Sequence, residues 1–142
     1  MARVLGIDYG ERRVGLALSD PTATIASPLP TLTRRKGKRP PIAPVARIAE
    51  EHGVAGIVLG LPLTLEGEDS DWTREVRDFG EALAERTGLP VALQDERMTS
   101  ARAERTVRRS LGLSKEKRKE KGRIDAAAAV LILQAYLDSK SS

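Results

Sequence analysis

The stretch Val54–Leu61 is the part of the sequence that most restricts the fold. It reads VAGIVLGL, eight residues without a charge, and it lies between Gly53 and Pro62. Strands exposed on one face alternate apolar and polar residues, whereas strands buried on both faces, as in parallel sheets, are continuously apolar. Because Gly53 and Pro62 interrupt regular structure on either side, the stretch predicts a short, buried strand of parallel type.

A β-hairpin is predicted ahead of this strand. The apolar residues of Arg3–Asp8 and the alternating residues of Arg13–Ser19 are separated by a tight turn that contains glycine, which is typical of two paired strands. Thr24–Thr33 also favours a strand, but Pro28 and Pro30 cannot donate backbone hydrogen bonds. This third strand is therefore expected at an edge of the sheet.

Helical periodicity follows in two segments. The apolar residues of Pro41–His52 recur on one helical face. A second helix can be capped by Ser70 or Asp71 and ends at Gly88, and the strand Val91–Gln94 comes after it. These segments supply the crossovers between parallel strands.

The last third of the chain is predicted to be helical with one interruption. A basic helix is capped by Thr99 or Ser100 and ends near Leu111, and a Gly/Lys-rich loop covers Gly112–Gly122. The final helix, Ile124–Leu137, is apolar almost all round and is expected to be largely buried.

The predicted order of elements is β-β-β-α-β-α-β-α-α. A hairpin followed by strand–helix–strand crossovers predicts a mixed sheet with helices on both faces, which is a three-layer α/β/α arrangement. No repeat or linker divides the sequence, so one domain is expected over residues 1–138, with a frayed tail at 139–142.

Composition excludes several kinds of active site. The chain has no cysteine and one histidine, His52, which rules out disulfides, thiolate metal sites, cysteine catalysis and a histidine-rich zinc site. A bound metal would be a hard cation with oxygen ligands. No apolar run approaches the ~20 residues that span a bilayer, and the first residues lack a signal-peptide pattern. We expect a cytoplasmic protein without membrane contact.

Positive charge is concentrated in two stretches of a chain whose formal net charge is +4. Such stretches are often only solvated loops, and their functional interpretation is contact with a nucleic-acid backbone. The first contains Arg34, Arg35, Lys36, Lys38 and Arg39, and the second contains Lys115, Lys117, Arg118, Lys119, Lys121 and Arg123. From the second stretch, Lys117, Arg118 and Lys119 are the predicted substrate contacts.

Acidic residues end or begin apolar segments at three places. Asp8 ends the first strand, Asp95 and Glu96 end the last strand, and Asp125 begins the most apolar helix. The carboxyl ends of parallel strands form the usual ligand crevice of open α/β sheets. If the first and last strands are parallel near the sheet centre, their terminal acids approach each other, and the last helix can bring Asp125 against them.

Converging carboxylates repel each other, and a divalent cation removes the conflict. Mg²⁺ or Mn²⁺ held by Asp8, Asp95, Glu96 and Asp125 would keep waters and a phosphate oxygen in its shell. Two such ions ~3.5–4 Å apart can generate an attacking hydroxide and stabilise a leaving oxygen. This chemistry cleaves phosphodiesters without histidine, cysteine or serine, in agreement with the composition.

Each acid also has a purely structural interpretation. Asp8 can initiate the turn that follows its strand, and Asp125 can cap its helix or interact with the helix dipole. Asp95 or Glu96 can pair with Arg97 or cap the following helix. The metal site is therefore predicted by the three places together and by none of them alone.

Arginines accompany these acids. Arg12 and Arg13 lie in the first turn beside Asp8, and Arg97 directly follows Glu96. Because the planar guanidinium suits phosphate oxygens, the three arginines are predicted to contact substrate. An ion pair within the protein is the alternative for Arg97.

Five blocks of sequence form a specific combination that extends over nearly the whole chain. They are Gly6–Gly10 (GIDYG), Arg13–Ala17 (RVGLA), Val58–Pro62 (VLGLP), Asp95–Ser100 (DERMTS) and Lys121–Ala129 (KGRIDAAAA). Together they resemble the YqgF family, the bacterial pre-16S ribosomal RNA nucleases that are also described as Holliday-junction-resolvase-like. Relatives usually carry an Asn-Met-Asp-Gly-like loop after the proline turn, whereas this chain has Thr64–Gly67 (TLEG).

The resemblance implies a ribonuclease H-like α/β fold whose five-stranded mixed sheet has the order 3-2-1-4-5. It implies an acidic catalytic site at Asp8, Glu96 and Asp125, with Asp95 and Arg97 adjoining. It also implies a substrate of structured nucleic acid, with maturation of ribosomal RNA precursors as the usual assignment.

The residues and the resemblance together predict a Mg²⁺- or Mn²⁺-dependent endonuclease that processes the 5′ end of pre-16S ribosomal RNA, in a ribosome-assembly context. A Holliday-junction resolvase acting on DNA is the first alternative, because it would use the same acids. A non-catalytic nucleic-acid-binding factor is the second. The third is an ATPase of the actin and sugar-kinase type, whose phosphate loop resembles the Asp-Tyr-Gly turn, although such enzymes need two domains. The oligomeric state stays open.

Overall fold

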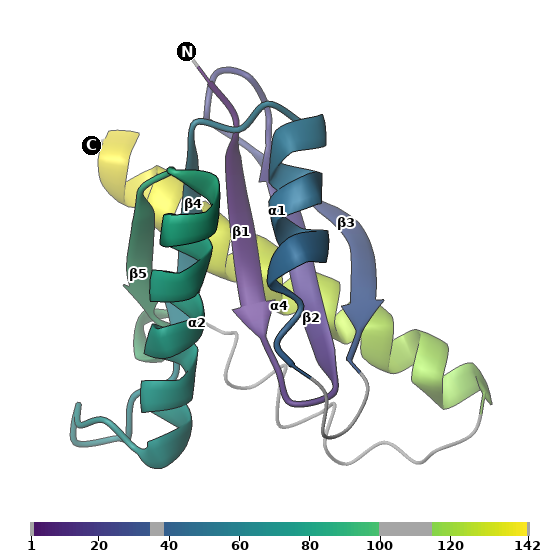
Figure 1. Cartoon of the computed structure of the whole chain (residues 1–142), viewed down its shortest axis with the longest axis vertical. Helices are drawn as coiled ribbons and strands as arrows, with labels where there is room; N and C mark the ends of the chain where they lie inside the picture. Colours follow the sequence, from purple (N-terminus) through teal and green to yellow (C-terminus); the bar gives the residue numbers. More distant parts are fainter. Residues whose placement is uncertain (1, 35–38, 100–114, 142) are drawn as a thin grey trace.

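A five-stranded sheet forms the centre of the described part of the chain (Figure 1). The computed structural model describes residues 2–34, 39–99 and 115–141, with 98, 115–125 and 141 described by their backbone alone. The strands are β1 (Val4–Tyr9), β2 (Arg13–Ser19), β3 (Ala26–Thr33), β4 (Gly56–Leu61) and β5 (Val91–Asp95). The helices are α1 (Ile42–Glu51), α2 (Asp71–Thr87), the short 3-10 turn η1 (Glu96–Met98) and α4 (Lys115–Ser141).

The strands are arranged in the order β3-β2-β1-β4-β5. β2 is antiparallel to both β1 and β3, whereas β4 is parallel to both β1 and β5. β1 is therefore the central strand, and the C-terminal ends of β1, β4 and β5 lie at the same edge of the sheet. The mixed sheet and the order 3-2-1-4-5 are confirmed.

The N-terminal hairpin and the edge position of the third strand are also confirmed. β3 begins at Ala26, two residues later than the sequence predicts, and lies at the outer edge of the sheet. Among the described strands β3 pairs with β2 alone, so Pro28 and Pro30 lie on an edge strand. An edge position suits proline because proline has no backbone N–H to donate to a second neighbouring strand.

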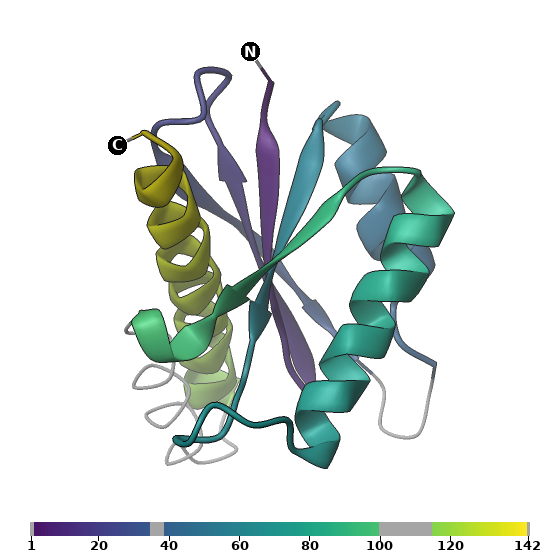
Figure 2. The ribbon, with the colours of Figure 1, turned by 90° about the vertical axis from the view of Figure 1, so that its left-hand side faces the viewer.

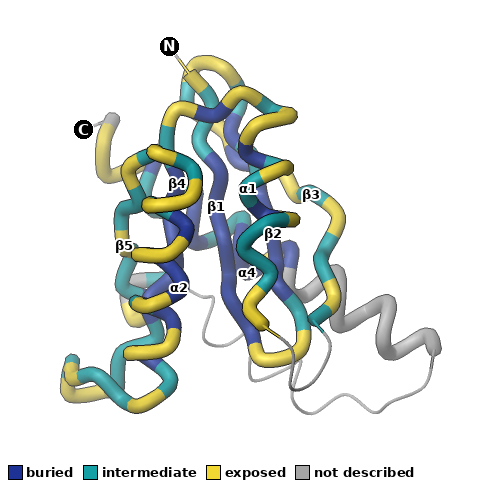
Figure 3. Tube along the Cα trace, in the orientation of Figure 1, coloured by how far each residue is buried: buried dark blue, intermediate teal, exposed yellow. Residues whose placement is uncertain are grey.

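The two faces of the sheet have separate apolar cores. α1 and α2 cover one face and α4 crosses the other, as the view along the sheet shows (Figure 2). The α1/α2 face includes Leu5, Ile7, Tyr9, Leu16, Ile57, Leu59, Leu61, Val45, Val76, Phe79 and Leu83. The α4 face includes Ala17, Val58, Ala128, Ala129, Ile132, Leu133 and Leu137. β1 is buried along most of its length, while exposed positions follow the outer sides of α1 and α2 (Figure 3).

α2 has the ends that the sequence predicts, and aromatic rings attach it to β1. Ser70 Oγ accepts a hydrogen bond from the Thr73 amide, and Thr73 Oγ1 accepts one from the Ser70 amide, which is a capping box. Tyr9 stacks on Trp72 and Phe79, with ring centroids 5.6 and 4.1 Å apart. The rings of Trp72 and Phe79 therefore contribute to packing, and they hold α2 at the end of β1.

α4 is longer than predicted at both ends. It begins at Lys115, so the loop predicted over Gly112–Gly122 is wrong for residues 115–122. Lysine, arginine and glutamate favour helix and outweigh a single glycine at position 122. The helix also continues through Ser141, beyond the predicted end. The predicted basic helix falls outside the described residues from position 100 onward. None of the described helices has the length and apolar character needed to cross a membrane.

Candidate active site at the C-terminal edge of the sheet

Asp8 lies on β1 with its side chain on the α4 face. Successive residues of a strand point to opposite faces, and Ile7 and Tyr9 belong to the α1/α2 core. The even-numbered residues of β1 point to the other face, toward α4, because a Cβ built on Gly6 would lie 2.6 Å from Cβ of Leu133 in α4. Asp8 follows Gly6 by two residues and is 0% exposed. Its carboxylate is therefore buried between the sheet and the α4 layer.

Glycines flank Asp8 on both neighbouring strands. Asp8 pairs with Gly15 of β2. One residue beyond the Ile7–Leu59 pair, it comes beside Gly60 of β4. Because neither neighbour carries a side chain, the sheet surface on both sides of the Asp8 carboxylate is open to groups from elsewhere in the chain.

Glu96 occupies the space above one of these glycines. A Cβ built on Gly60 would lie 2.8 Å from Glu96 Oε1 and 3.3 Å from its Cγ. Glu96 is 0% exposed, although it lies in η1 directly after an edge strand. Adjacent strands are ~4.8 Å apart, so the structure brings Glu96 and Asp8 to neighbouring positions on the α4 face, as the sequence predicts.

Asp125, the third predicted acid, lies in α4 where the backbone alone is described. α4 approaches β1 at Ala129, whose carbonyl oxygen would lie 3.3 Å from a Cβ on Gly6. Residues four apart share one face of a helix, so Asp125 is one turn before Ala129 on that face. The Asp125 side chain is outside the described residues, and within them no three acidic, histidine or cysteine side chains form a group that could hold a metal.

Asp95 and Arg97 hold each other on the opposite face. Asp95 pairs with Leu61, a residue of the α1/α2 core, so its side chain points away from that of Asp8. Its two oxygens accept hydrogen bonds from Arg97 Nε at 3.2 and 3.0 Å and from Nη2 at 2.7 Å. These bonds raise the pKa of Arg97 above its usual value. The structure thus contains the internal ion pair that was the alternative for Arg97, while the metal contact of Asp95 and the phosphate contact of Arg97 stay predictions.

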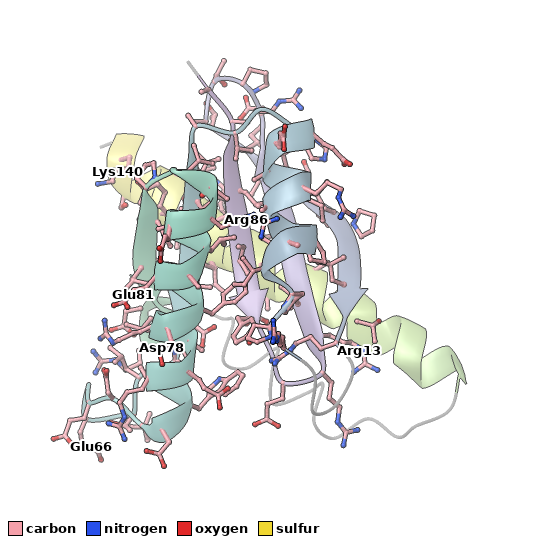
Figure 4. The ribbon with its side chains drawn as sticks, viewed as in Figure 1. Arg13, Glu66, Asp78, Glu81, Arg86 and Lys140 are labelled. Atoms are coloured by element: carbon pink, nitrogen blue, oxygen red, sulfur yellow. The ribbon has the colours of Figure 1, made fainter. Side chains whose placement is uncertain are left out.

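Arg12 and Arg13 lie at the β1–β2 turn, at the end of the sheet where β1 finishes. Arg12 is exposed and Arg13 is half-buried, and the Arg13 side chain lies at the lower end of the sheet (Figure 4). Both are close to the edge that carries Asp8, and their contact with substrate stays a prediction.

Arg34 supports this turn, a role that the sequence did not indicate. Its amide donates to the Arg12 carbonyl oxygen at 2.7 Å, and its Nη1 donates to the Gly10 carbonyl oxygen at 2.8 Å. The guanidinium carbon lies 4.7 Å from the centroid of the Tyr9 ring. Burial raises the pKa of the Tyr9 hydroxyl, and the Arg34 charge opposes this shift. A cation–π contact between residues far apart in the sequence leaves no pattern along the chain, so the sequence shows only the basic stretch.

Lys117, Arg118 and Lys119 belong to the first turns of α4, where their side chains lie outside the described residues. The structure therefore places their backbone on a helix, not on the predicted loop. Their contact with substrate stays a prediction.

Acidic side chains cover the exposed side of α2. Asp78 and Glu81 point outward from the helix, and Glu66 lies at the tip of the preceding loop (Figure 4). The exposed acids of α2 are Asp71, Glu75, Asp78, Glu81 and Glu85. Arg74 and Arg86 are exposed on the same helix, and Arg74 pairs with Asp71, so this surface has a small net negative charge that disfavours phosphate.

The donors at Asp8 and Glu96 fit a hard divalent cation. Both carboxylates are 0% exposed and come from neighbouring positions on the α4 face of the sheet. Carboxylate oxygens are the ligands that Mg²⁺ and Mn²⁺ prefer. Gly60, directly beneath the Glu96 carboxylate, leaves space that any Cβ would fill.

Comparison with known proteins identifies close relatives over nearly the full length. A family model described as RuvX, Holliday junction resolvase, matches residues 2–139. A protein of Chloroflexus aggregans named "Putative pre-16S rRNA nuclease" is 45% identical over 137 residues, covering 96% of this chain and 94% of the relative. A protein of the same name from Koribacter versatilis is 44% identical over 138 residues, covering 97% and 88%.

Solved structures with a similar fold include two resolvases. Thermus thermophilus RuvC in complex with a Holliday junction substrate has a TM-score of 0.58 at 14% identity, covering 99% of this chain and 96% of that one. The fowlpox virus Holliday junction resolvase has a TM-score of 0.52 at 16% identity, covering 96% and 99%. At these identities the similarity concerns the fold alone, and it confirms the ribonuclease H-like fold.

Proposed function

This chain belongs to the RuvX family, which is the same family as the YqgF family that its sequence motifs resemble. We therefore propose that it is a divalent-metal-dependent endonuclease that processes pre-16S ribosomal RNA. Family membership supports the broader assignment, a hydrolase that acts on nucleic acid. The metal dependence, the substrate and the site residues are our proposal.

One observation carries the proposal. Two completely buried carboxylates from distant segments lie on the α4 face of the sheet, one on β1 and the other over the neighbouring strand β4. Asp8 and Glu96 are both 0% exposed, and Glu96 lies directly over Gly60, the neighbour of Asp8. Apolar residues would fill such a position more favourably if it were only structural. Functional sites are where buried charged groups gather.

In the proposed site each residue has a defined task. Asp8, on the central strand, and Glu96, on η1, would hold the cation together with Asp125 at the start of the apolar part of α4. A divalent cation bound there would activate water and neutralise charge on the phosphate. Arg12 and Arg13 would bind phosphates beside the cleaved bond and so orient the backbone. The covering α4 layer would limit the access of bulk water to the carboxylates.

Ribosomal RNA is proposed over a DNA junction because relatives at 39–45% identity carry the pre-16S rRNA nuclease name. The resolvase alternative is supported by the description of the family model. We further propose a cytoplasmic location and a ribosome-assembly context, which follow from a ribosomal RNA substrate.

A competition assay tests this function. The protein is incubated with equal amounts of a labelled RNA spanning the 5′ end of 16S RNA and its leader and of a four-way DNA junction, with Mg²⁺, with Mn²⁺ or with EDTA. We expect the RNA to be cut at least about tenfold faster than the junction, and EDTA to abolish cleavage. Faster cleavage of the junction would favour the resolvase, and binding without cleavage of either would favour the non-catalytic factor.

Charge reversal at Lys117, Arg118 and Lys119 tests the basic segment of α4. If these residues contact phosphates, the triple change to glutamate should weaken nucleic-acid binding and reduce the slope of log K against log[salt] by about 2–3. Fluorescence anisotropy between 50 and 200 mM salt, about a fourfold range, measures the slope. An unchanged slope would place the segment outside the binding surface. Charge reversal at Glu50 and Glu51 of α1, away from this segment, is the control for a general charge effect.

A further inference from the structure

The Asp95–Arg97 pair forms at the point where β5 becomes η1. Asp95 Oδ1 also accepts a hydrogen bond from the Arg97 backbone amide at 2.8 Å, which caps the turn. Arg97 therefore binds Asp95 through both its backbone and its guanidinium. Arg97 is an exposed residue and Asp95 is half-buried, with 34% of the Arg97 side chain and 24% of the Asp95 side chain accessible. A pair of this geometry fixes the turn more firmly than a single exposed ion pair does.

This turn determines where Glu96 lies. Leu61 is in register with Asp95 and Gly60 with Gln94, so an extended continuation of β5 would carry Glu96 past Gly60 by two residues. That displacement is ~6.6 Å along the strands. In the structure the chain turns instead, and the Glu96 carboxylate lies over Gly60, at 2.8 Å from a Cβ built there.

Arg97 also fastens the turn to the loop between β4 and α2. Its Nη1 donates to the Leu65 carbonyl oxygen at 3.3 Å. The guanidinium lies against Gly67, whose Cβ would come 3.0 Å from Nη1 and 3.2 Å from Nη2. The loop has bonds of its own, from the Gly67 amide to the Thr64 carbonyl at 2.9 Å and from the Thr64 amide to the Glu68 carbonyl at 2.9 Å. The Glu96 turn is therefore attached to a part of the chain that is itself well held.

We propose that Arg97 is a positioning residue, which binds Asp95 and the Leu65–Gly67 loop so that Glu96 is held beside Asp8 for the metal. The inference rests on the proposed function, because it assumes that Glu96 is a metal ligand. Without the guanidinium, η1 can relax toward the extended conformation and the carboxylate moves away from Gly60. Arg97 itself does not contact the phosphate, which distinguishes it from Arg12 and Arg13.

Arg77 supplies a matched control. It makes an ion pair of the same type with Asp69, through Nε at 2.7 Å and Nη2 at 3.0 Å, on the same β4–α2 loop. Its exposure is also similar, with 39% of Arg77 and 30% of Asp69 exposed. R77Q therefore removes an ion pair of the same type from the loop and leaves the bonds of Arg97 with Asp95 and Leu65 in place.

The experiment compares R97Q, R97K and R77Q with the unaltered protein. Mn²⁺ affinity is measured by calorimetry without nucleic acid, and kcat and KM are measured in Mn²⁺ with the labelled RNA. We expect R97Q to lower kcat and Mn²⁺ affinity by roughly 10- to 100-fold, as loss of groups that orient metal ligands does, with KM within about twofold. R97K should recover part of the loss, because an ammonium can replace one of the hydrogen bonds to Asp95 but cannot make the paired bonds from Nε and Nη2 of a guanidinium. R77Q should change each quantity by less than about twofold.

Three results would overturn the inference. A raised KM with a smaller salt slope and unchanged Mn²⁺ affinity would make Arg97 a phosphate contact. Unchanged values for R97Q would show that Glu96 is held without it. Equal losses in R97Q and R77Q would trace the effect to the loop as a whole.

The variant E96Q separates this inference from the proposed function. If E96Q keeps full activity and Mn²⁺ affinity, Glu96 is not a ligand, and the proposed site fails together with the role of Arg97. If E96Q is inactive while R97Q is normal, the proposed site stands and the positioning role of Arg97 alone is wrong.

Discussion

Replacing Asp8 by asparagine is expected to abolish cleavage while the chain stays folded. The change keeps the shape of the side chain and removes the charge that would hold the cation. Loss of the several kcal/mol that a bound metal contributes to the transition state corresponds to a fall in rate of about a thousandfold. Asp8 is completely buried, and asparagine has nearly the same volume, so the packing is kept and the protein should still unfold in one cooperative thermal transition.

Single-turnover cleavage of the labelled RNA, nucleic-acid binding and thermal unfolding measure these effects for D8N. Binding should persist, since phosphate contacts and not the acids supply most of the affinity. D78N is the matched control, because Asp78 lies on the exposed side of α2, pointing away from the sheet. A D8N protein that cuts within about tenfold of the unaltered rate would exclude Asp8 from the catalytic site.

Replacing Gly60 by alanine is expected to damage both stability and activity. The added Cβ would lie 2.5 Å from Ile132 Cδ1 in α4 and 2.8 Å from Glu96 Oε1. Overpacking of this kind costs about 1–3 kcal/mol of folding free energy. Because one of the two clashing groups is the Glu96 carboxylate, the cleavage rate should also fall, by about 100-fold for a displacement near 1 Å. Denaturant unfolding and the cleavage assay measure the two losses separately.

G56A is the control on the same strand. A Cβ on Gly56 would meet Pro90 at 3.7 Å, which is an ordinary contact, so stability should change by less than about 1 kcal/mol and the cleavage rate should be unaffected. If G60A were as stable and active as the unaltered protein, the space over Gly60 would not be occupied as described, and the placement of Glu96 would be wrong.

The strand positions and the convergence of two acids could be predicted because both depend on short-range patterns. The uninterrupted apolar run at β4 predicts a strand buried on both faces, and Asp8 and Glu96 are marked by their positions at strand ends. The rule that parallel strands present their carboxyl ends at one edge then brings the two acids together. α4 is longer than the sequence predicts for a local reason as well, because the helix propensity of the lysine, arginine and glutamate residues before Gly122 outweighs that glycine.

The partners of Asp95, Arg97 and Arg34 could not be predicted in the same way. The sequence leaves two uses for the Arg97 guanidinium, a phosphate or a carboxylate within the protein, and both are chemically reasonable. The ion pair forms because the register of β5 against β4 turns Asp95 to the face opposite Asp8 and within reach of Arg97.

The sequence alone determined the strands, the helices α1 and α2, the mixed α/β architecture and the acids that follow its strands, because periodicity and turn residues act between neighbours along the chain. The tertiary structure decided which of those acids are buried together and which arginine supports them. Those choices depend on which face each side chain takes and on distances between segments that come together only when the sheet and α4 pack.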